Sequence, residues 1–175
     1  LTPTTAGKII NHGPEPIWVG RAGKLERWPA PFGGAEQLMQ PIDRIVSAVN
    51  RRVDESSPLV VARLPADSRM PRGARVNVVL PPLSLNGPTV TIRLFPHALS
   101  LTQLIERESI DRRTALLLKA CVEGRLNVVV SGGTGSGKTT LLNALASFLH
   151  PDHRIVTIEG AAEPILNQPH THRLE

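Results

Sequence analysis

The sequence predicts an α/β fold with a parallel sheet, preceded by a smaller α+β domain. An apolar run at 126–131 passes through a glycine-rich turn into a helical pattern that starts near Lys138, and a second apolar run follows at 154–158. This order of strand, helix and strand is typical of the beginning of a parallel sheet. Before residue 96, short strand patterns alternate with glycine and proline, which favours an antiparallel sheet.

The N-terminal part begins with strands joined by tight turns between residues 8 and 29. Apolar residues then recur at the spacing of an amphipathic helix between about 36 and 49. These residues are Leu38, Met39, Ile42, Ile45, Val46 and Val49. Pro41 either kinks this helix or marks a restart with proline in the first turn. Asn50 tolerates the left-handed conformation that often ends a helix.

Three further strands are predicted at 59–64, 75–80 and 89–94, separated by connections rich in proline and glycine. The segment Pro65–Gly73 is polar and rich in turn residues, so we expect a loop there. These elements make residues 1–95 a small α+β domain with an antiparallel sheet.

The chain changes character after residue 95. Residues 96–110 are expected to form a linker and a first helix, with Ser100 and Gln103 spaced as a capping box. Asp111 can cap the next helix, which we expect to stop at Gly124. The remaining elements are a strand at 126–131, a helix at about 138–149 and a strand at 154–158, so 111–175 is predicted as part of a second, α/β domain. A right-handed crossover puts the glycine-rich turn at the carboxyl edge of the sheet.

Composition narrows the class of protein. The 175 residues are 41% hydrophobic, carry a net charge of +5 and have a sequence pI of about 10.3, which favours an acidic partner such as nucleotide, nucleic acid or a membrane surface. The single cysteine, Cys121, lies in an apolar helical stretch and is expected to be buried and structural. No apolar run approaches the roughly 18 residues that cross a bilayer, and no signal peptide opens the chain. We expect a cytoplasmic protein.

The glycine-rich turn carries the strongest chemical signal. Gly132, Gly137, Lys138 and Thr139 satisfy the pattern G-x-x-x-x-G-K-[ST] between a predicted strand and a predicted helix. Glycine lets successive backbone N–H groups point at phosphate oxygens, lysine supplies a charge for the β- and γ-phosphates, and the threonine hydroxyl suits Mg²⁺. The alternative, a glycine-rich hairpin tip, is disfavoured because the whole pattern lies between a predicted strand and a predicted helix. The predicted ligand-binding residues here are Gly132, Gly133, Thr134, Gly135, Ser136, Gly137, Lys138, Thr139 and Thr140.

Further segments outside this loop carry a family resemblance. They are Ile17–Val19, Gly23–Glu26, Arg51–Pro58, Ala62–Pro65, Arg75–Asn77, Pro81–Leu83, Thr91–Arg93, Ser131–Thr140 and Leu166–His170. Together they resemble the type II/type IV secretion ATPases, and within them the CpaF-like motors of tight-adherence (Tad) pili. The resemblance spans nearly the whole chain.

The resemblance implies a RecA-like P-loop nucleotide-binding domain behind an N-terminal domain, in a hexameric ATPase that uses ATP and Mg²⁺ to drive pilus assembly or protein secretion. It implies homo-oligomer partners, contact with inner-membrane pilus or secretion platform proteins, and no direct nucleic-acid partner. The expected location is the cytoplasm, peripherally at the inner membrane. It also places the family's Walker B segment and His box beyond Glu175.

Residue roles follow from the same resemblance. Residues 132–139 match the Walker A motif, in which Lys138 also has a catalytic role, and Glu159 and Glu163 match the two glutamates of the acidic Asp box. Carboxylates there can order the water shell of Mg²⁺ or polarise the attacking water. Arg93 matches an arginine near the nucleotide, where a cation can neutralise phosphate charge.

Departures from the family pattern leave two alternatives open. Gly160 and Pro164 replace the family's aspartate and leucine, and the segment Ala66–Ala74 looks like a loop insertion. The two replacements favour a catalytically degenerate module that binds nucleotide or docks subunits. A nucleic-acid motor is the second alternative, because P-loops serve helicases too. However, the basic residues are scattered, and the few aromatic residues form no stacking set.

Overall fold

The computed structural model describes residues 7–13, 16–21, 23–29, 32–68, 70–159, 166 and 169–174. These residues form two compact units, one ending at Pro96 and the other beginning at His97. Each unit has its own secondary structure and is treated by itself below. Within the described ranges, no helix is long and apolar enough to cross a membrane.

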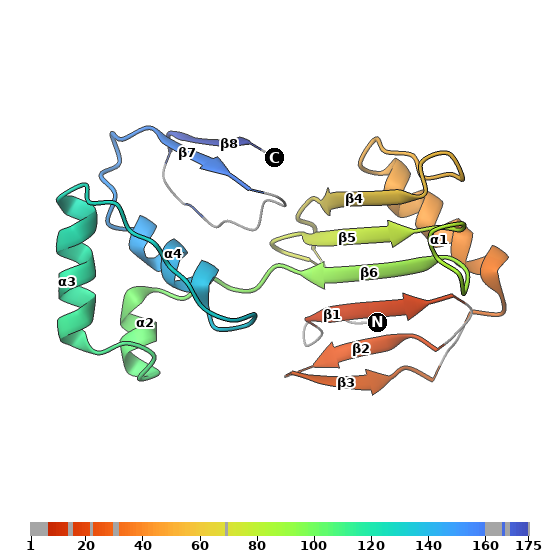
Figure 1. The fold of residues 1–175 in the computed structure, drawn as a ribbon, viewed down its shortest axis with the longest axis horizontal. Helices are drawn as coiled ribbons and strands as arrows, with labels where there is room; N and C mark the ends of the chain where they lie inside the picture. Colours follow the sequence, from red (N-terminus) through yellow and green to blue (C-terminus); the bar gives the residue numbers. More distant parts are fainter. Residues whose placement is uncertain are drawn as a thin grey trace. The chain divides into compact units, whose positions relative to one another are not determined.

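The first unit is built on a six-stranded antiparallel sheet with the strand order β3-β2-β1-β6-β5-β4 (Figure 1). The strands are β1 (Lys8–His12), β2 (Trp18–Arg21), β3 (Lys24–Arg27), β4 (Leu59–Leu64), β5 (Ala74–Val79) and β6 (Thr89–Leu94). The prediction of an antiparallel α+β arrangement is confirmed, and the predicted strands agree within a residue. The register puts alternate residues of each strand on opposite faces.

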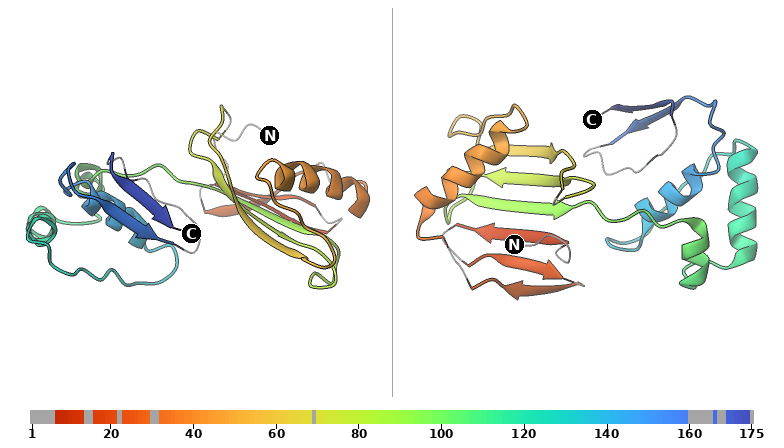
Figure 2. Two further views of the ribbon diagram at one scale, coloured as in Figure 1. Left: turned by 90° about the horizontal axis from the view of Figure 1, so that it is seen from above. Right: turned by 180° about the vertical axis from the view of Figure 1, so that it is seen from behind.

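One face of this sheet is covered by the helix α1 (Ala35–Ser47), as Figure 2 shows from above. Leu38, Ile42 and Val46 of α1 are at most 2% exposed and pack with apolar residues of β4, β5 and β6. Such burial stabilises by about 1.5–3 kcal/mol per large apolar side chain. It outweighs the backbone hydrogen bond that Pro41 cannot make, so the helix continues through the proline. Asn50 adopts φ 54°, as expected after the helix.

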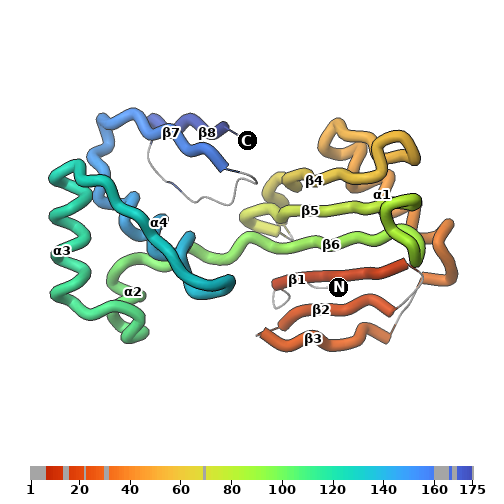
Figure 3. The backbone as a smooth tube through the Cα atoms, in the orientation of Figure 1, coloured from red at the N-terminus to blue at the C-terminus, as the bar shows by residue number. Residues whose placement is uncertain are grey.

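The described residues of the second unit form three helices and a parallel pair of strands, whose course Figure 3 traces. They are α2 (Leu101–Glu106), α3 (Arg112–Glu123), α4 (Lys138–Ala146), β7 (Ile155–Ile158) and β8 (Thr171–Leu174). The predicted caps are confirmed. The Ser100 hydroxyl accepts from the Gln103 N–H while the Gln103 side chain accepts from the Ser100 N–H, and the Asp111 carboxylate accepts from the N–H groups of Arg113 and Thr114.

Two expectations for this unit are corrected. Residues 126–131 are not a strand, because this apolar run pairs with no other strand among the described residues, and Val129 remains 91% exposed. A β-strand needs a hydrogen-bonded neighbour as well as suitable side chains. Helix α4 ends at Ala146 rather than 149. Helix α3 stops at Gly124, as expected, and the next residue, Arg125, has a left-handed φ of 57°.

Candidate functional site

The phosphate loop, residues 132–139, has a backbone that only glycine adopts without strain at several positions. Gly132, Gly135 and Gly137 have φ of 155°, 77° and 89°. Because a Cβ costs about 1–2 kcal/mol in the left-handed region, side chains there would distort the loop. A Cβ on Gly132 would also lie 2.7 Å from the Ser136 hydroxyl oxygen. The sequence pattern therefore reflects a real conformational requirement.

Lys138 directs its charge back onto the loop. Its Nζ donates to the carbonyl oxygens of Gly132 at 3.0 Å and Gly133 at 2.7 Å. Because the ammonium has three donors and no acceptor, these neutral carbonyls hold it without cancelling its charge. The cation is thus fixed beside the loop and can exchange a carbonyl oxygen for a phosphate oxygen.

Helix α4 differs from α2 and α3 at its N-terminus. The other two helices have side-chain caps, whereas the N-cap of α4 is Gly137, which has none. The first N–H groups of a helix need acceptors, and the helix dipole makes that end attractive to anions. An anion at the phosphate loop would therefore find the N–H groups of α4, the charge of Lys138 and the loop backbone together.

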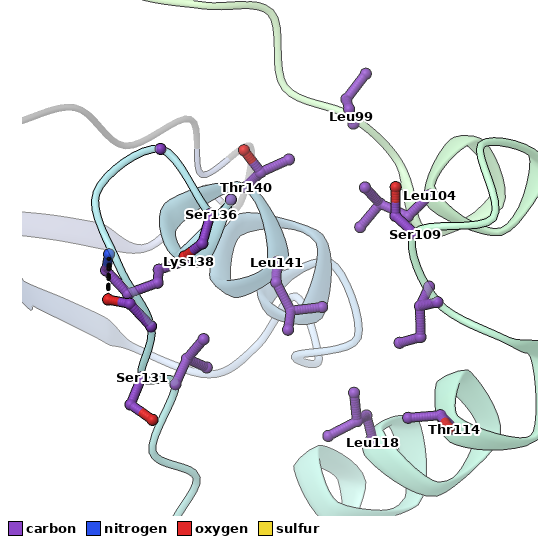
Figure 4. Close-up of a pocket in the computed structure, with 15 residues that line it drawn as sticks. Leu99, Leu104, Ser109, Thr114, Leu118, Ser131, Ser136, Lys138, Thr140 and Leu141 are labelled. Carbon is purple, nitrogen blue, oxygen red and sulfur yellow. Dashed lines mark hydrogen bonds between the residues drawn. The ribbon is translucent and has the colours of Figure 1, made fainter.

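A cavity of about 530 Å³ opens beside the loop and is drawn in Figure 4. The loop side supplies Gly132, Gly135, Ser136, Gly137, Lys138 and Thr140. The facing side is mainly apolar, with Leu99, Leu104 and, from α3, Leu118, and it also includes Ser109 and Thr114. Ligand sites of this size commonly combine an apolar wall with a few polar groups that fix orientation. The arrangement suits a ligand that has a polyanionic end and a less polar body.

The donor set fits Mg²⁺ better than a metal that needs an all-protein cage. Thr139 lies exposed in the first turn of α4, where its hydroxyl can serve as a single protein ligand. Across the described part of the chain, no group of three or more His, Cys, Asp or Glu side chains could hold a metal. Mg²⁺ is typically bound by few protein oxygens together with phosphate oxygens and water.

The two predicted glutamates are placed differently. Glu159 directly follows β7, where its N–H donates to the Leu174 carbonyl of β8 at 3.1 Å, but its side chain does not line the cavity. Glu163 lies outside the described residues. Their catalytic roles stay predictions, as does the contact of Arg93, which lies on β6 of the first unit.

Arg93 is part of a basic row that sequence reasoning missed. Arg93 pairs across strands with Lys8 on one side and Arg75 on the other, and Arg75 pairs with Arg63. Directly paired residues share a face of a sheet, so these four basic residues lie side by side on the face opposite α1. Like charges in such positions repel, which makes this face favourable for an anion. Only the strand register, set by the fold, reveals the row.

The apolar wall of the cavity was also not predicted. One signal for it exists in the sequence, because Thr114 and Leu118 are four residues apart and thus share a face of α3. Nothing in the sequence indicates that this face meets the phosphate loop. No sequence pattern marks Leu99 as a cavity residue, because it belongs to neither a helix nor a strand.

The sequence of this chain is similar to that of known secretion and conjugal-transfer proteins. The sequence profile of the type II/IV secretion system proteins matches residues 1–175. A Mycobacterium tuberculosis protein named for conjugal transfer is 34% identical over 95% of this chain and 47% of its own length. The VirB11 protein of the Brucella suis type IV secretion system is 28% identical over 91% of this chain and 49% of its own length. The chain thus spans about half the length of these curated relatives.

The fold is also similar to that of a solved pilus motor. The crystal structure of the pilus retraction motor PilT with bound ADP matches with a TM-score of 0.66, covering 97% of this chain and 48% of that one at 15% identity. At this identity the likeness concerns the fold. It agrees with a RecA-like α/β unit behind an N-terminal domain.

Proposed function

Because the chain belongs to the family of type II/IV secretion system proteins, we propose that its phosphate loop binds Mg²⁺-ATP in an ATPase that powers secretion or pilus assembly. The observation that carries the proposal is the contact of Lys138 with the carbonyl oxygens of Gly132 and Gly133, next to the uncapped start of α4. The charge of Lys138, the N-terminal end of α4 and the backbone N–H groups of the loop all contribute positive potential at the same place. This arrangement favours a ligand with several adjacent negative charges.

Each loop residue has a distinct part in the proposed site. The N–H groups of Gly133 to Thr140 would bind phosphate oxygens, Lys138 would neutralise the charge that develops on the transferred phosphoryl group, and Thr139 would supply a hydroxyl to Mg²⁺. The ion, when bound, polarises the phosphate oxygens. On the family resemblance, Glu159 and Glu163 would order the water around the ion, and Arg93 would contribute positive charge.

On the family resemblance, we further propose a hexameric assembly that works in the cytoplasm at inner-membrane platform proteins. Within the family we place the chain with the CpaF-like motors of tight-adherence pili. The names of the relatives, which include conjugal transfer, type IV secretion and pilus retraction, support a role in moving macromolecules rather than in metabolism.

A catalytically degenerate nucleotide-binding or subunit-docking module remains the second candidate function. Gly160 and Pro164, which replace the family's aspartate and leucine, favour it. Such a module would bind ATP through Lys138 without releasing phosphate. A nucleic-acid motor is a weaker candidate, because the few aromatic residues of the sequence form no stacking set.

Binding and turnover of a fluorescent ATP analogue test the proposal. We expect binding that weakens when Mg²⁺ is chelated, and phosphate release that is slow compared with that of a full-length relative, because this chain spans about half the length of its curated relatives. Absence of ATP binding by the folded chain would refute the proposal. ATP binding without any phosphate release would favour the docking module, and salt-sensitive DNA or RNA binding would favour the nucleic-acid motor.

A further inference from the structure

The chain leaves the first unit through Phe95 and Pro96, directly after β6. Proline has no N–H for the β-ladder and restricts the residue before it to extended conformations, so this pair is stiff. His97, Ala98 and Leu99 follow and belong to neither helix nor strand. The Ser100 cap of α2 then fixes the chain again.

Three residues hold this exit segment against the first unit. The Gly73 carbonyl accepts from the Phe95 N–H at 3.2 Å, and Arg72 Nη1 donates to the Pro96 carbonyl at 3.0 Å. The Arg63 guanidinium lies 5.2 Å from the centre of the Phe95 ring, which is 9% exposed. We call Arg63, Arg72 and Gly73 the linker clamp. Charge-assisted hydrogen bonds and cation–π contacts are among the stronger polar interactions.

The linker clamp depends on glycine at position 73. Gly73 is buried, with φ 79°, and a Cβ there would lie 2.2 Å from the Leu64 carbonyl oxygen. The backbone must pass this close to the end of β4 to present its carbonyl to Phe95. The clamp is therefore built into the conformation of the β4–β5 connection.

The same connection is anchored in the core of the first unit. The Gly73 N–H donates to the Met70 carbonyl at 2.8 Å, and the Met70 side chain packs against the core that includes Ile42. Residues 70–73 therefore transmit the rigidity of the core to Pro96. The β4–β5 connection contains nearly all of the segment Ala66–Ala74, which looks like an insertion relative to the family pattern. Residues of this segment anchor the connection to the core and hold Pro96.

We propose that the linker clamp keeps the chain rigid through Pro96 and confines bending between the two units to His97–Leu99. Hinges are commonly a few loop residues that absorb changes in φ and ψ between fixed ends. Both ends are fixed here, by the clamp at Pro96 and by the capping box at Ser100. Leu99, at the far end of the hinge, also lines the cavity beside the phosphate loop. The β4–β5 connection thus sets where the chain pivots.

Hydrogen exchange on the full chain tests the first half of the proposal. In Arg72→Ala, we expect the Phe95 amide to exchange at least about tenfold faster, because the loss of a charge-assisted bond loosens the segment. The Leu94 amide is an internal control, since it donates to the Gly7 carbonyl at 3.0 Å and not to the clamp. Arg72→Lys should have an intermediate effect, and Arg51→Ala, at another exposed arginine of this unit, should have none. Equal Phe95 exchange in wild type and Arg72→Ala would overturn the proposal.

Distance distributions between spin labels test the second half. With Cys121→Ser as background, labels at Lys24→Cys on β3 and Arg112→Cys on α3 report on the two units. We expect a broader distribution in Arg72→Ala than in wild type or Arg51→Ala. The two tryptophans of the chain, Trp18 and Trp28, both lie in the first unit. Their fluorescence should therefore show the same urea unfolding of this unit in Arg72→Ala as in wild type. Faster Phe95 exchange with an unchanged distribution would overturn the hinge assignment.

Discussion

Lys138 lies where two structural requirements coincide. It is the first residue of α4, and its ammonium is held by the Gly132 and Gly133 carbonyls. A lysine at an ordinary helix N-terminus is unfavourable because the dipole is positive there. The cost is offset when an anion binds at the same place. This electrostatic conflict is the residue-level reason to regard the loop as an anion site rather than a simple turn.

The glycines of the loop allow a matched test at the same scale. A Cβ at Gly133 or at Gly137 meets no heavy atom within 4 Å, but only Gly137 has a left-handed φ, of 89°. We therefore expect Gly137→Ala to destabilise the folded chain by about 1 kcal/mol, and Gly133→Ala to have little effect. Thermal unfolding monitored by circular dichroism measures the difference. Equal melting temperatures for the two variants would contradict the assigned loop conformation.

Helix α3 shows at the level of an element how a cap couples stability to pH. Hydrogen bonds from the Thr114 hydroxyl and the Thr114 N–H, with a further one from the Arg113 N–H, lower the pKa of Asp111 below its usual 3.8. A carboxyl with a lowered folded-state pKa stabilises above its unfolded pKa and loses that contribution as pH falls through the folded value. The cap of α3 is therefore complete at neutral pH and weakens below about pH 4.

Replacing Asp111 by asparagine isolates this contribution. Asparagine is also a good N-cap but does not titrate, so Asp111→Asn keeps a neutral acceptor at every pH. We expect the melting temperature of the wild type to exceed that of Asp111→Asn at pH 7, and the gap to narrow between pH 4 and pH 2.5. Thermal unfolding followed by circular dichroism at pH 7, 4 and 2.5 measures this difference in melting temperature. A gap that does not depend on pH would show that the Asp111 charge is unimportant.

Helices and strands were predictable from the sequence where the local residue pattern agrees with the packing that the segment finds in the fold. The apolar spacing of Leu38, Ile42 and Val46 predicted α1, and Ser100 and Asp111 predicted the starts of α2 and α3. The motif predicted the phosphate loop because its chemistry is local. The segment 126–131 has strand-like residues but no paired neighbour in the described chain, so pattern alone misled. The apolar cavity wall and the basic row depend on register and packing, which sequence spacing does not contain.

At the scale of the whole molecule, the two units contribute different parts of the proposed ATPase. The first unit contributes a rigid sheet with a basic row and the linker clamp, and the second contributes the phosphate loop and its cavity. The hinge at His97–Leu99 connects them. In the proposed motor, nucleotide bound beside Leu99 would act on the hinge directly, which is how a local binding event can become a movement of a whole unit.

The affinity of Lys138→Ala for ATP tests the central claim most directly. Calorimetric titration with Mg²⁺-ATP should show at least about a tenfold loss relative to wild type, because a charge-assisted contact with the phosphates is removed. Lys119→Ala is the matched control, since it removes a lysine of α3 that pairs with Glu123 and should leave the affinity unchanged. Circular dichroism confirms that both variants are folded. Unchanged ATP affinity in folded Lys138→Ala would contradict the assignment of the phosphate loop as the nucleotide site.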